Sequence, residues 1–267
     1  MFRLDIVAWE IEANSSAQQQ SHQLSEQQLR QLAQSITVKV IAGEGWGSGI
    51  LIHRQGQVYT VLTNRHVLEA GNGNVYKIQT PNGQTYPANL VRIVGLDLGW
   101  ISFRSAKDYP IASFKAVSTL GIGDDVFAAG FPYDPEPSRS RGLAFTEGKV
   151  SLFSEQAFAG GYQIGFTNPI WKGMSGGPLL DRKGQVLGIN GIQSYPLWGN
   201  PYIFTDGSEA PKALQEKMSQ LSWAIPTETF LQLEQGFSRR SMPPSLTQPP
   251  MMGDPKLLPI LPKSQLW

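Results

Sequence analysis

The residues whose types and spacing suggest chemistry are one serine between glycines and a small set of histidines. Ser175 lies in residues 173–178, which read Gly-Met-Ser-Gly-Gly-Pro. Flanking glycines let backbone and substrate approach the serine hydroxyl closely, as a nucleophile requires. The chain contains three histidines, and all of them precede Ser175: His22, His53 and His66. The pattern predicts a serine hydrolase.

The order of these residues along the chain separates the known serine hydrolase arrangements. An α/β-hydrolase places its acid and then its histidine after the serine, but no histidine follows Ser175. A subtilisin-like order needs an aspartate before the histidine. The only aspartate upstream of His66 is Asp5, in a segment with little sign of packed structure. The remaining order is histidine, aspartate, serine.

His66 is the histidine best placed to act as a general base. It lies near the end of residues 58–67, a β-branched and aromatic run typical of a strand that delivers its last residues to a loop. His53 stands beside a turn signal at residues 54–56, and His22 lies among glutamines. Both of these are interpreted as solvated. We therefore expect His66 to take part in catalysis.

The candidate acids between His66 and Ser175 are, besides glutamates, Asp97, Asp108, Asp124, Asp125 and Asp134. Asp97 opens an apolar run over residues 97–103, where a carboxylate can be buried against an imidazole N–H. The other four aspartates stand in sequences typical of turns. Asp97 is therefore the expected catalytic acid, and a strand-end acid satisfied by backbone amides is the alternative interpretation.

The surrounding sequence predicts mostly β structure to hold these groups. From residue 36 to about residue 192, short apolar strands alternate with turn signals, as in antiparallel hairpins. Before them, a capping-box pattern at residues 25–28 precedes Leu29, Leu32 and Ile36 at near-helical spacing, which predicts a short helix. Proline and apolar spacing in residues 211–221 predict a second helix within a long segment, residues 194–221.

Composition excludes several classes of protein. The 267 residues include 22 basic and 21 acidic residues, a net charge of +1, and no long basic run, so nucleic acid is not an expected partner. No apolar run is long enough for a membrane span. Acidic residues interrupt the N-terminal segment too early for a clear signal peptide. The absence of cysteine excludes disulfides and a cysteine nucleophile.

Six segments together resemble the trypsin-like serine proteases of the chymotrypsin fold, and among them the bacterial HtrA (Deg) type. They fall in the family's order and cover residues from about 36 to 232; they are residues 45–50, 62–67, 97–101, 173–178, 184–190 and 222–226. The resemblance implies an all-β fold of two antiparallel six-stranded barrels. The expected divisions are a segment with a short helix (1–35), a first barrel (36–115), a second barrel with a helix-containing insertion (116–236) and a proline-rich tail, extended or disordered (237–267).

The resemblance also implies a serine endopeptidase that forms an acyl-enzyme on Ser175, with His66 as base and Asp97 orienting the imidazole. Backbone N–H groups of Gly173 and Ser175 are expected to form the oxyanion hole. The substrate main chain is expected to bind along the strand after the serine, at Gly191, Ile192 and Gln193. The implied partner is a polypeptide substrate, no metal or organic cofactor is expected, and the implied location is extracytoplasmic (periplasmic). No pattern predicts an oligomeric state.

The chain also departs from the family pattern. Met174 replaces the aspartate that pairs with a new N-terminus in chymotrypsin-type zymogens, so activation by N-terminal clipping is not expected. Trp171 and Lys172 replace the usual residues of the oxyanion loop. The tail is too short for the PDZ domain that HtrA enzymes carry. The expected specificity pocket contains no obvious acidic residue, which favours a small or apolar preference.

Two other functions remain open beside the endopeptidase. One is a protease-like binding or scaffold protein that keeps the fold without turnover, and the second is an esterase that uses the same three residues. The 194–221 insertion interrupts the wall of the expected specificity pocket. We expect it to shape or cover the substrate cleft, with structural decoration as the alternative.

Overall fold

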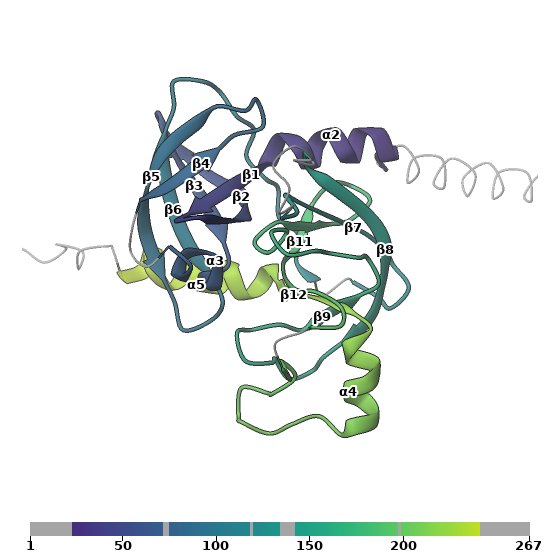
Figure 1. Ribbon diagram of the computed structural model, residues 1–267. Coiled ribbons are helices and arrows are strands. Elements are labelled where there is room, and N and C mark those ends of the chain that lie inside the picture. Colours follow the sequence, from purple (N-terminus) through teal and green to yellow (C-terminus); the bar gives the residue numbers. More distant parts are fainter. Residues whose placement is uncertain (1–22, 72–74, 118–119, 134–141, 197–198, 241–267) are drawn as a thin grey trace, which may run out of the picture.

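The computed structural model describes residues 23–71, 75–117, 120–133, 142–196 and 199–240. His22, Asp134 and the tail from residue 241 onward lie outside these ranges. The described residues form two closed barrels that lie side by side (Figure 1). Every strand pairing within each barrel is antiparallel.

The first barrel contains six strands in the order β1-β2-β3-β6-β5-β4, closed by pairing of β1 with β4. The strands are β1 (Thr37–Ala42), β2 (Gly45–Gln55), β3 (Val58–Thr63), β4 (Tyr76–Gln79), β5 (Thr85–Ile93) and β6 (Gly99–Arg104). Gly43 and Gly56 adopt the left-handed φ of +60° that the tight β1–β2 and β2–β3 turns require. Alternating residues of β1 and β3, including Val38, Val40 and Val61, fill the barrel interior.

The second barrel repeats the same strand order, β7-β8-β9-β12-β11-β10, closed by pairing of β10 with β7. Its strands are β7 (Asp125–Gly130), β8 (Ala144–Phe153), β9 (Ile164–Phe166), β10 (Pro178–Leu180), β11 (Val186–Ile192) and β12 (Ser222–Pro226). β11 and β12 are buried along their whole length. The chain crosses between the barrels near residue 113, because the Ala112 N–H bonds to Leu51 of β2 and the Lys115 N–H bonds to Val186 of β11.

Helices cover the outside of the barrels. Helix α2 (Glu26–Ile36) begins with the predicted capping box, in which Ser25 and Gln28 bond reciprocally, and it buries Leu29, Ala33 and Ile36. Helix α4 (Lys212–Ser219) lies in the predicted insertion, on a projection of the second barrel (Figure 1). None of the helices in the described part of the chain combines the length and apolar character needed to span a bilayer.

Two helices differ from the sequence-based expectation. The loop expected around His66 is instead a short helix, α3 (Arg65–Glu69). The second unexpected helix, α5 (Thr227–Arg240), follows β12 and extends past residue 236, where the second barrel was expected to end. Phe230 of α5 contacts the rings of Phe114 and Trp100 in tilted arrangements, at ring-centroid distances of 5.1 and 6.2 Å, so α5 also packs against the first barrel.

Candidate active site

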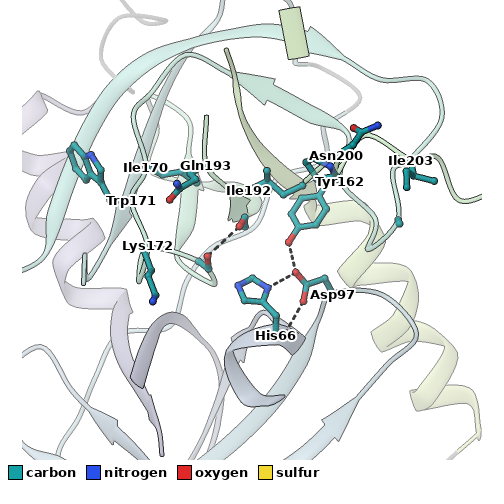
Figure 2. Close-up of a pocket in the computed structure, with 14 residues that line it drawn as sticks. His66, Asp97, Tyr162, Ile170, Trp171, Lys172, Ile192, Gln193, Asn200 and Ile203 are labelled. Carbon is teal, nitrogen blue, oxygen red and sulfur yellow. Dashed lines mark hydrogen bonds and ion pairs between the residues drawn. The ribbon is translucent and has the colours of Figure 1, made fainter. Parts of the chain in front are cut away.

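Neighbouring strands of the first barrel bring His66 and Asp97 together. Thr63, the last residue of β3, pairs with Gly99, the first residue of β6. His66 follows this pair and Asp97 precedes it, so both emerge at the same end of the barrel. The His66 Nδ1 and Asp97 Oδ2 atoms lie 2.7 Å apart (Figure 2). Because an ionised carboxylate only accepts hydrogen bonds, Nδ1 carries a proton, and in the neutral imidazole Nε2 then presents a lone pair.

The start of α3 also binds the Asp97 side chain. The first N–H groups of a helix have no partner within it, and the His66 N–H donates to Asp97 Oδ1 at 2.9 Å. Asn64, which precedes α3, donates its side-chain amide to the Asp97 carbonyl at 2.9 Å. The helix that replaces the expected loop therefore places both His66 donors on one carboxylate.

The net effect of its surroundings lowers the pKa of Asp97 below the ordinary aspartate value. Burial raises the pKa of this carboxyl, but the hydrogen bonds from His66 and Tyr162, together with the charge of His66, outweigh burial. Asp97 is therefore ionised at neutral pH, as an orienting partner of an imidazole must be.

The other candidate acids that the structure describes have different partners. Asp108 pairs with Arg54 at 2.6 Å, and Asp125 pairs with Lys149 at 2.6 Å and with Arg182 at 2.9 Å. Asp124 accepts the Gly121 N–H at 2.8 Å. His53 is exposed on β2 and pairs across to Thr60 of β3, so it belongs to a strand rather than a turn.

Ser175 lines the same cavity as His66 and Asp97 but comes from the second barrel. It lies in the connection between β9 and β10, and its hydroxyl donates to the Gly191 carbonyl at 3.2 Å. No hydrogen bond joins Ser175 to His66 among the described residues. The hydroxyl is therefore bonded to β11 rather than to the imidazole.

The residues before Ser175 form a turn that leaves two amides free. Met174 N–H bonds to the Trp171 carbonyl at 2.9 Å and Gly173 has a φ of +93°, as in a type II turn. The carbonyl of Lys172 accepts the Tyr133 N–H at 2.6 Å, and the carbonyl of Gly173 accepts the Ser48 hydroxyl at 2.7 Å. Among the described residues, no acceptor binds the N–H of Gly173 or Ser175. Two backbone donors next to the Ser175 hydroxyl along the chain thus have no partner within the described ranges.

The cavity next to these groups has a volume of about 720 Å³. Its predicted members are Ser175, His66, Asp97, Gly191, Ile192 and Gln193. The remaining wall is largely apolar, and it includes Ala159, Ile170, Trp171, Pro201 and Ile203. The 194–221 insertion forms one side of the cavity, because it contributes Asn200, Pro201 and Ile203 to the lining (Figure 2).

Sequence reasoning missed Tyr162, which also lines the cavity. Its hydroxyl donates to Asp97 Oδ2, the oxygen that faces the His66 ring (Figure 2). The only sequence signal near it is the pair Gly160 and Gly161, which indicates a turn but not its distant partner. Within the described residues, His, Asp and Glu side chains form no group of three or more that could hold a metal ion.

Known proteins resemble this chain in sequence. Residues 47–189 match the family model described as a trypsin-like peptidase domain. A probable periplasmic serine endoprotease, DegP-like, from Buchnera aphidicola is 31% identical over 176 residues, which cover 64% of this chain and 35% of that protein. The serine protease Do-like HtrA of Bacillus subtilis is 29% identical over 153 residues, covering 56% and 34%. The chain thus spans about a third of the length of these curated relatives.

Solved structures resemble it in fold. An HtrA-type protease solved with a tripeptide superposes with a TM-score of 0.60 and 21% identity, over 80% of this chain and 64% of that one. A serine endoprotease from Yersinia pestis superposes with a TM-score of 0.59 and 24% identity, over 81% and 67%. These likenesses and the two closed barrels confirm the fold class predicted from the sequence.

Proposed function

This chain belongs to the trypsin-like peptidase family, and from that premise we propose that it is a serine endopeptidase whose catalytic residues are His66, Asp97 and Ser175. The observation that carries the proposal is the His66 Nδ1 to Asp97 Oδ2 contact of 2.7 Å, in the cavity that Ser175 also lines. With Nδ1 donating to Asp97, a neutral imidazole carries its lone pair on Nε2, as a general base requires. The relatives named above are serine proteases by name, which supports the same reaction.

The proposed reaction begins with rotation of the Ser175 hydroxyl from the Gly191 carbonyl toward His66. His66 Nε2 takes the hydroxyl proton as the oxygen attacks a peptide carbonyl, and Asp97 stabilises the imidazolium. The free N–H groups of Gly173 and Ser175 bind the oxyanion. The imidazolium then protonates the leaving amine, which leaves an ester on Ser175. Water, deprotonated by His66, cleaves this ester and restores the hydroxyl.

The buried side chain before the nucleophile supports activity without N-terminal clipping. Met174 is fully buried and packs with apolar residues of the second barrel such as Val117 and Ile170. A charged N-terminus inserted at this position would find no carboxylate and would lose its hydration. We propose that the turn of residues 171–174, the oxyanion turn, forms in the full chain without a processing step.

The composition of the cavity supports a preference for an apolar side chain before the scissile bond. Its apolar lining includes Ile170, Ile192 and Ile203. Besides the proposed catalytic residues, Lys172 is the one charged side chain among the described residues that line it. We propose that the substrate main chain pairs with Gly191, Ile192 and Gln193 while its side chain enters the apolar region. Through Ile203 the 194–221 insertion would contact that side chain.

The names of relatives support a location outside the cytoplasm. The Buchnera protein is named a periplasmic endoprotease, and we propose an extracytoplasmic location for this chain as well. Fractionation of cells that produce the full natural protein would test this, and recovery only with cytoplasmic markers would contradict it.

Labelling with a fluorophosphonate probe tests the proposed function. We expect the wild-type chain to label at Ser175 and to cleave unfolded casein, and we expect Ser175→Ala to do neither while keeping the same thermal unfolding midpoint. Within the described residues the Ser175 hydroxyl bonds to Gly191 alone, so its loss should not weaken the fold. Folded wild-type protein that neither labels nor cleaves would favour the scaffold interpretation, and turnover of esters without amides would favour the esterase.

A further inference from the structure

A turn of the second barrel holds Asp97 through both its backbone and its side chain. The 158–162 turn is closed by the Phe158 N–H on the Tyr162 carbonyl, at 3.0 Å, and by the Gly161 N–H on the Phe158 carbonyl, at 2.8 Å. The Asp97 N–H donates to the Gly160 carbonyl at 2.9 Å, and the Tyr162 hydroxyl donates to Asp97 Oδ2. Asp97 belongs to the first barrel, so this turn bridges the two barrels at the proposed site.

Glycines make this approach possible. Gly160 and Gly161 have φ values of +91° and +98°, which side chains other than glycine rarely adopt. An added Cβ at Gly160 would lie 3.2 Å from the Asp97 Cβ. The double glycine thus allows the turn to reach the acid while Tyr162 stays buried, with 4% of its surface exposed.

Gly191 of β11 provides the space that the tyrosine occupies. An added Cβ at Gly191 would lie 2.0 Å from the Tyr162 hydroxyl oxygen and 2.5 Å from its ring carbon Cε1. Gly191 has no left-handed φ, so its backbone does not require glycine. The space that Tyr162 occupies, and not the backbone conformation of β11, therefore explains the absence of a side chain at residue 191.

We propose that Tyr162 is a positioning residue for the proposed catalytic residues. Its hydroxyl holds the Asp97 carboxylate in the orientation that binds His66. Three donors then surround this carboxylate: the His66 N–H on Oδ1, and His66 Nδ1 and the Tyr162 hydroxyl on Oδ2. The proposal rests on the proposed endopeptidase function. In this arrangement the second barrel supplies the nucleophile and also orients the acid of the first.

Tyr162 remains a donor over the whole working range of an enzyme. Burial, the charge of Asp97 and the hydrogen bond to Asp97 raise the pKa of Tyr162 well above the ordinary tyrosine value. The only other titratable side chain that bonds to the Asp97 carboxylate among the described residues is His66. The hydroxyl therefore stays protonated while His66 changes its charge during turnover.

Replacing the hydroxyl alone tests the proposal. Tyr162→Phe keeps the ring that fills the space beside Gly191, and we expect kcat to fall about tenfold to a hundredfold with KM unchanged. With one donor fewer on Oδ2, the carboxylate stabilises protonated His66 more strongly. The acid limb of the pH profile of kcat/KM should therefore move to higher pH.

A matched control is Tyr59→Phe in the first barrel. Tyr59 is fully buried, its hydroxyl donates to the Lys107 carbonyl at 3.0 Å and accepts the Tyr109 N–H, and it does not line the cavity. We expect this variant to lose stability without any change in kcat or in the pH profile. If Tyr162→Phe gave the same result, or lowered kcat without moving the acid limb, Tyr162 would have only a structural role and the proposal would fail.

Moving the hydroxyl from the 158–162 turn to β11 provides a rescue experiment. In Tyr162→Ala the ring is gone, and a serine at residue 191 would place its hydroxyl close to where the tyrosine oxygen was. We expect the double variant Tyr162→Ala, Gly191→Ser to be about tenfold faster than Tyr162→Ala, Gly191→Ala, which has the same Cβ without the hydroxyl. Equal rates would overturn the proposal.

The outcomes separate this inference from the proposed function. Fluorophosphonate labelling and casein cleavage by the wild type, with equal kcat in Tyr162→Phe, would reject the role of Tyr162 and leave the endopeptidase standing. A folded wild-type chain that does not label at Ser175 would overturn both.

Discussion

The two barrels share one strand order but use corresponding connections differently. In each barrel the connection from the third to the fourth strand carries a proposed catalytic residue, His66 on α3 in the first and Ser175 beyond the oxyanion turn in the second. The connection from the fifth to the sixth strand is residues 94–98 in the first barrel, where it carries Asp97. In the second barrel it is residues 193–221, the segment that contains the insertion.

Under the proposed function, the first barrel serves proton transfer and the loops of the second barrel contact the substrate. The first barrel places His66 and Asp97 through the register of two paired strands, which backbone hydrogen bonds determine. The second barrel places the oxyanion turn and the cavity wall on loops, which can change in length while the barrel remains closed. We therefore expect changes to His66 and Asp97 in the first barrel to reduce turnover for every substrate, and changes to the cavity wall in the second barrel to alter which substrates are used.

The largest expected effect comes from the acid of the first barrel. Asp97→Asn should lower kcat about 10⁴-fold, because an amide favours the wrong imidazole tautomer, with little change in KM for any peptide. Steady-state cleavage of two peptides that differ before the scissile bond checks this. Asp181→Asn is the matched control, since the Asp181 side chain, like that of Asp97, is mostly shielded from solvent, and it pairs with Lys115 at 3.3 Å outside the cavity. A substrate-dependent loss in Asp97→Asn would break the distinction between the barrels.

A smaller loss is expected from the oxyanion turn. In Gly173→Ala the new Cβ would lie 2.5 Å from the Phe131 carbonyl oxygen, so the turn must change and its N–H must leave the oxyanion position. We expect kcat to fall about a hundredfold to a thousandfold. The matched control is Gly123→Ala, which introduces an alanine at the similar φ of +95° in a place where nothing lies within 4 Å of the Cβ. If both variants retained full activity, the proposed oxyanion hole would be wrong.

The insertion should affect selectivity more than rate. Ile203→Ala enlarges the apolar wall, and we expect kcat/KM to fall about tenfold for a peptide with a large apolar residue before the scissile bond and to change little for alanine. Ile122→Ala, at a position 74% exposed and outside the cavity, should leave both values unchanged. An equal fall for both peptides in Ile203→Ala would show that the insertion supports the fold and not the preference.

The smallest effect concerns the pH dependence of stability. The pKa of Asp97 is lower in the folded chain than its ordinary value, so its ionised form stabilises the fold above about pH 4, and this contribution is lost as the pH falls through the folded value. Urea unfolding of wild type and Asp97→Asn at pH 6 and pH 3 measures it. We expect the difference in unfolding free energy between the two proteins to be smaller at pH 3, and a constant difference would contradict the assignment.

Parts of this arrangement follow from sequence because they depend on local patterns. The capping box of α2 and the apolar spacing of the insertion helix are short-range signals, and both helices form. Chain order and strand ends selected His66, Asp97 and Ser175, which the fold brings to one cavity. Their catalytic roles remain a proposal.

Other parts depend on contacts between distant residues. α3 forms where a loop was expected, and the His66 N–H in its first turn finds an acceptor on Asp97, 31 positions along the chain. Tyr162 reaches the same carboxylate from 65 positions away, and no local pattern encodes that partner. α5 extends past the expected end of the barrel and buries Phe230 against both barrels, which its own sequence does not indicate.

Ser48 of β2 bonds to two residues of the second barrel, Gly173 in the oxyanion turn and Ser175, the proposed nucleophile, just after it. Its hydroxyl binds the Gly173 carbonyl at 2.7 Å, and its N–H binds the Ser175 carbonyl at 2.8 Å. A first barrel folded alone would have base and acid without a nucleophile, and a second barrel alone would lack these supports. Under the proposed function, a chain still emerging from the ribosome would be harmless to its neighbours, because cleavage would need both barrels.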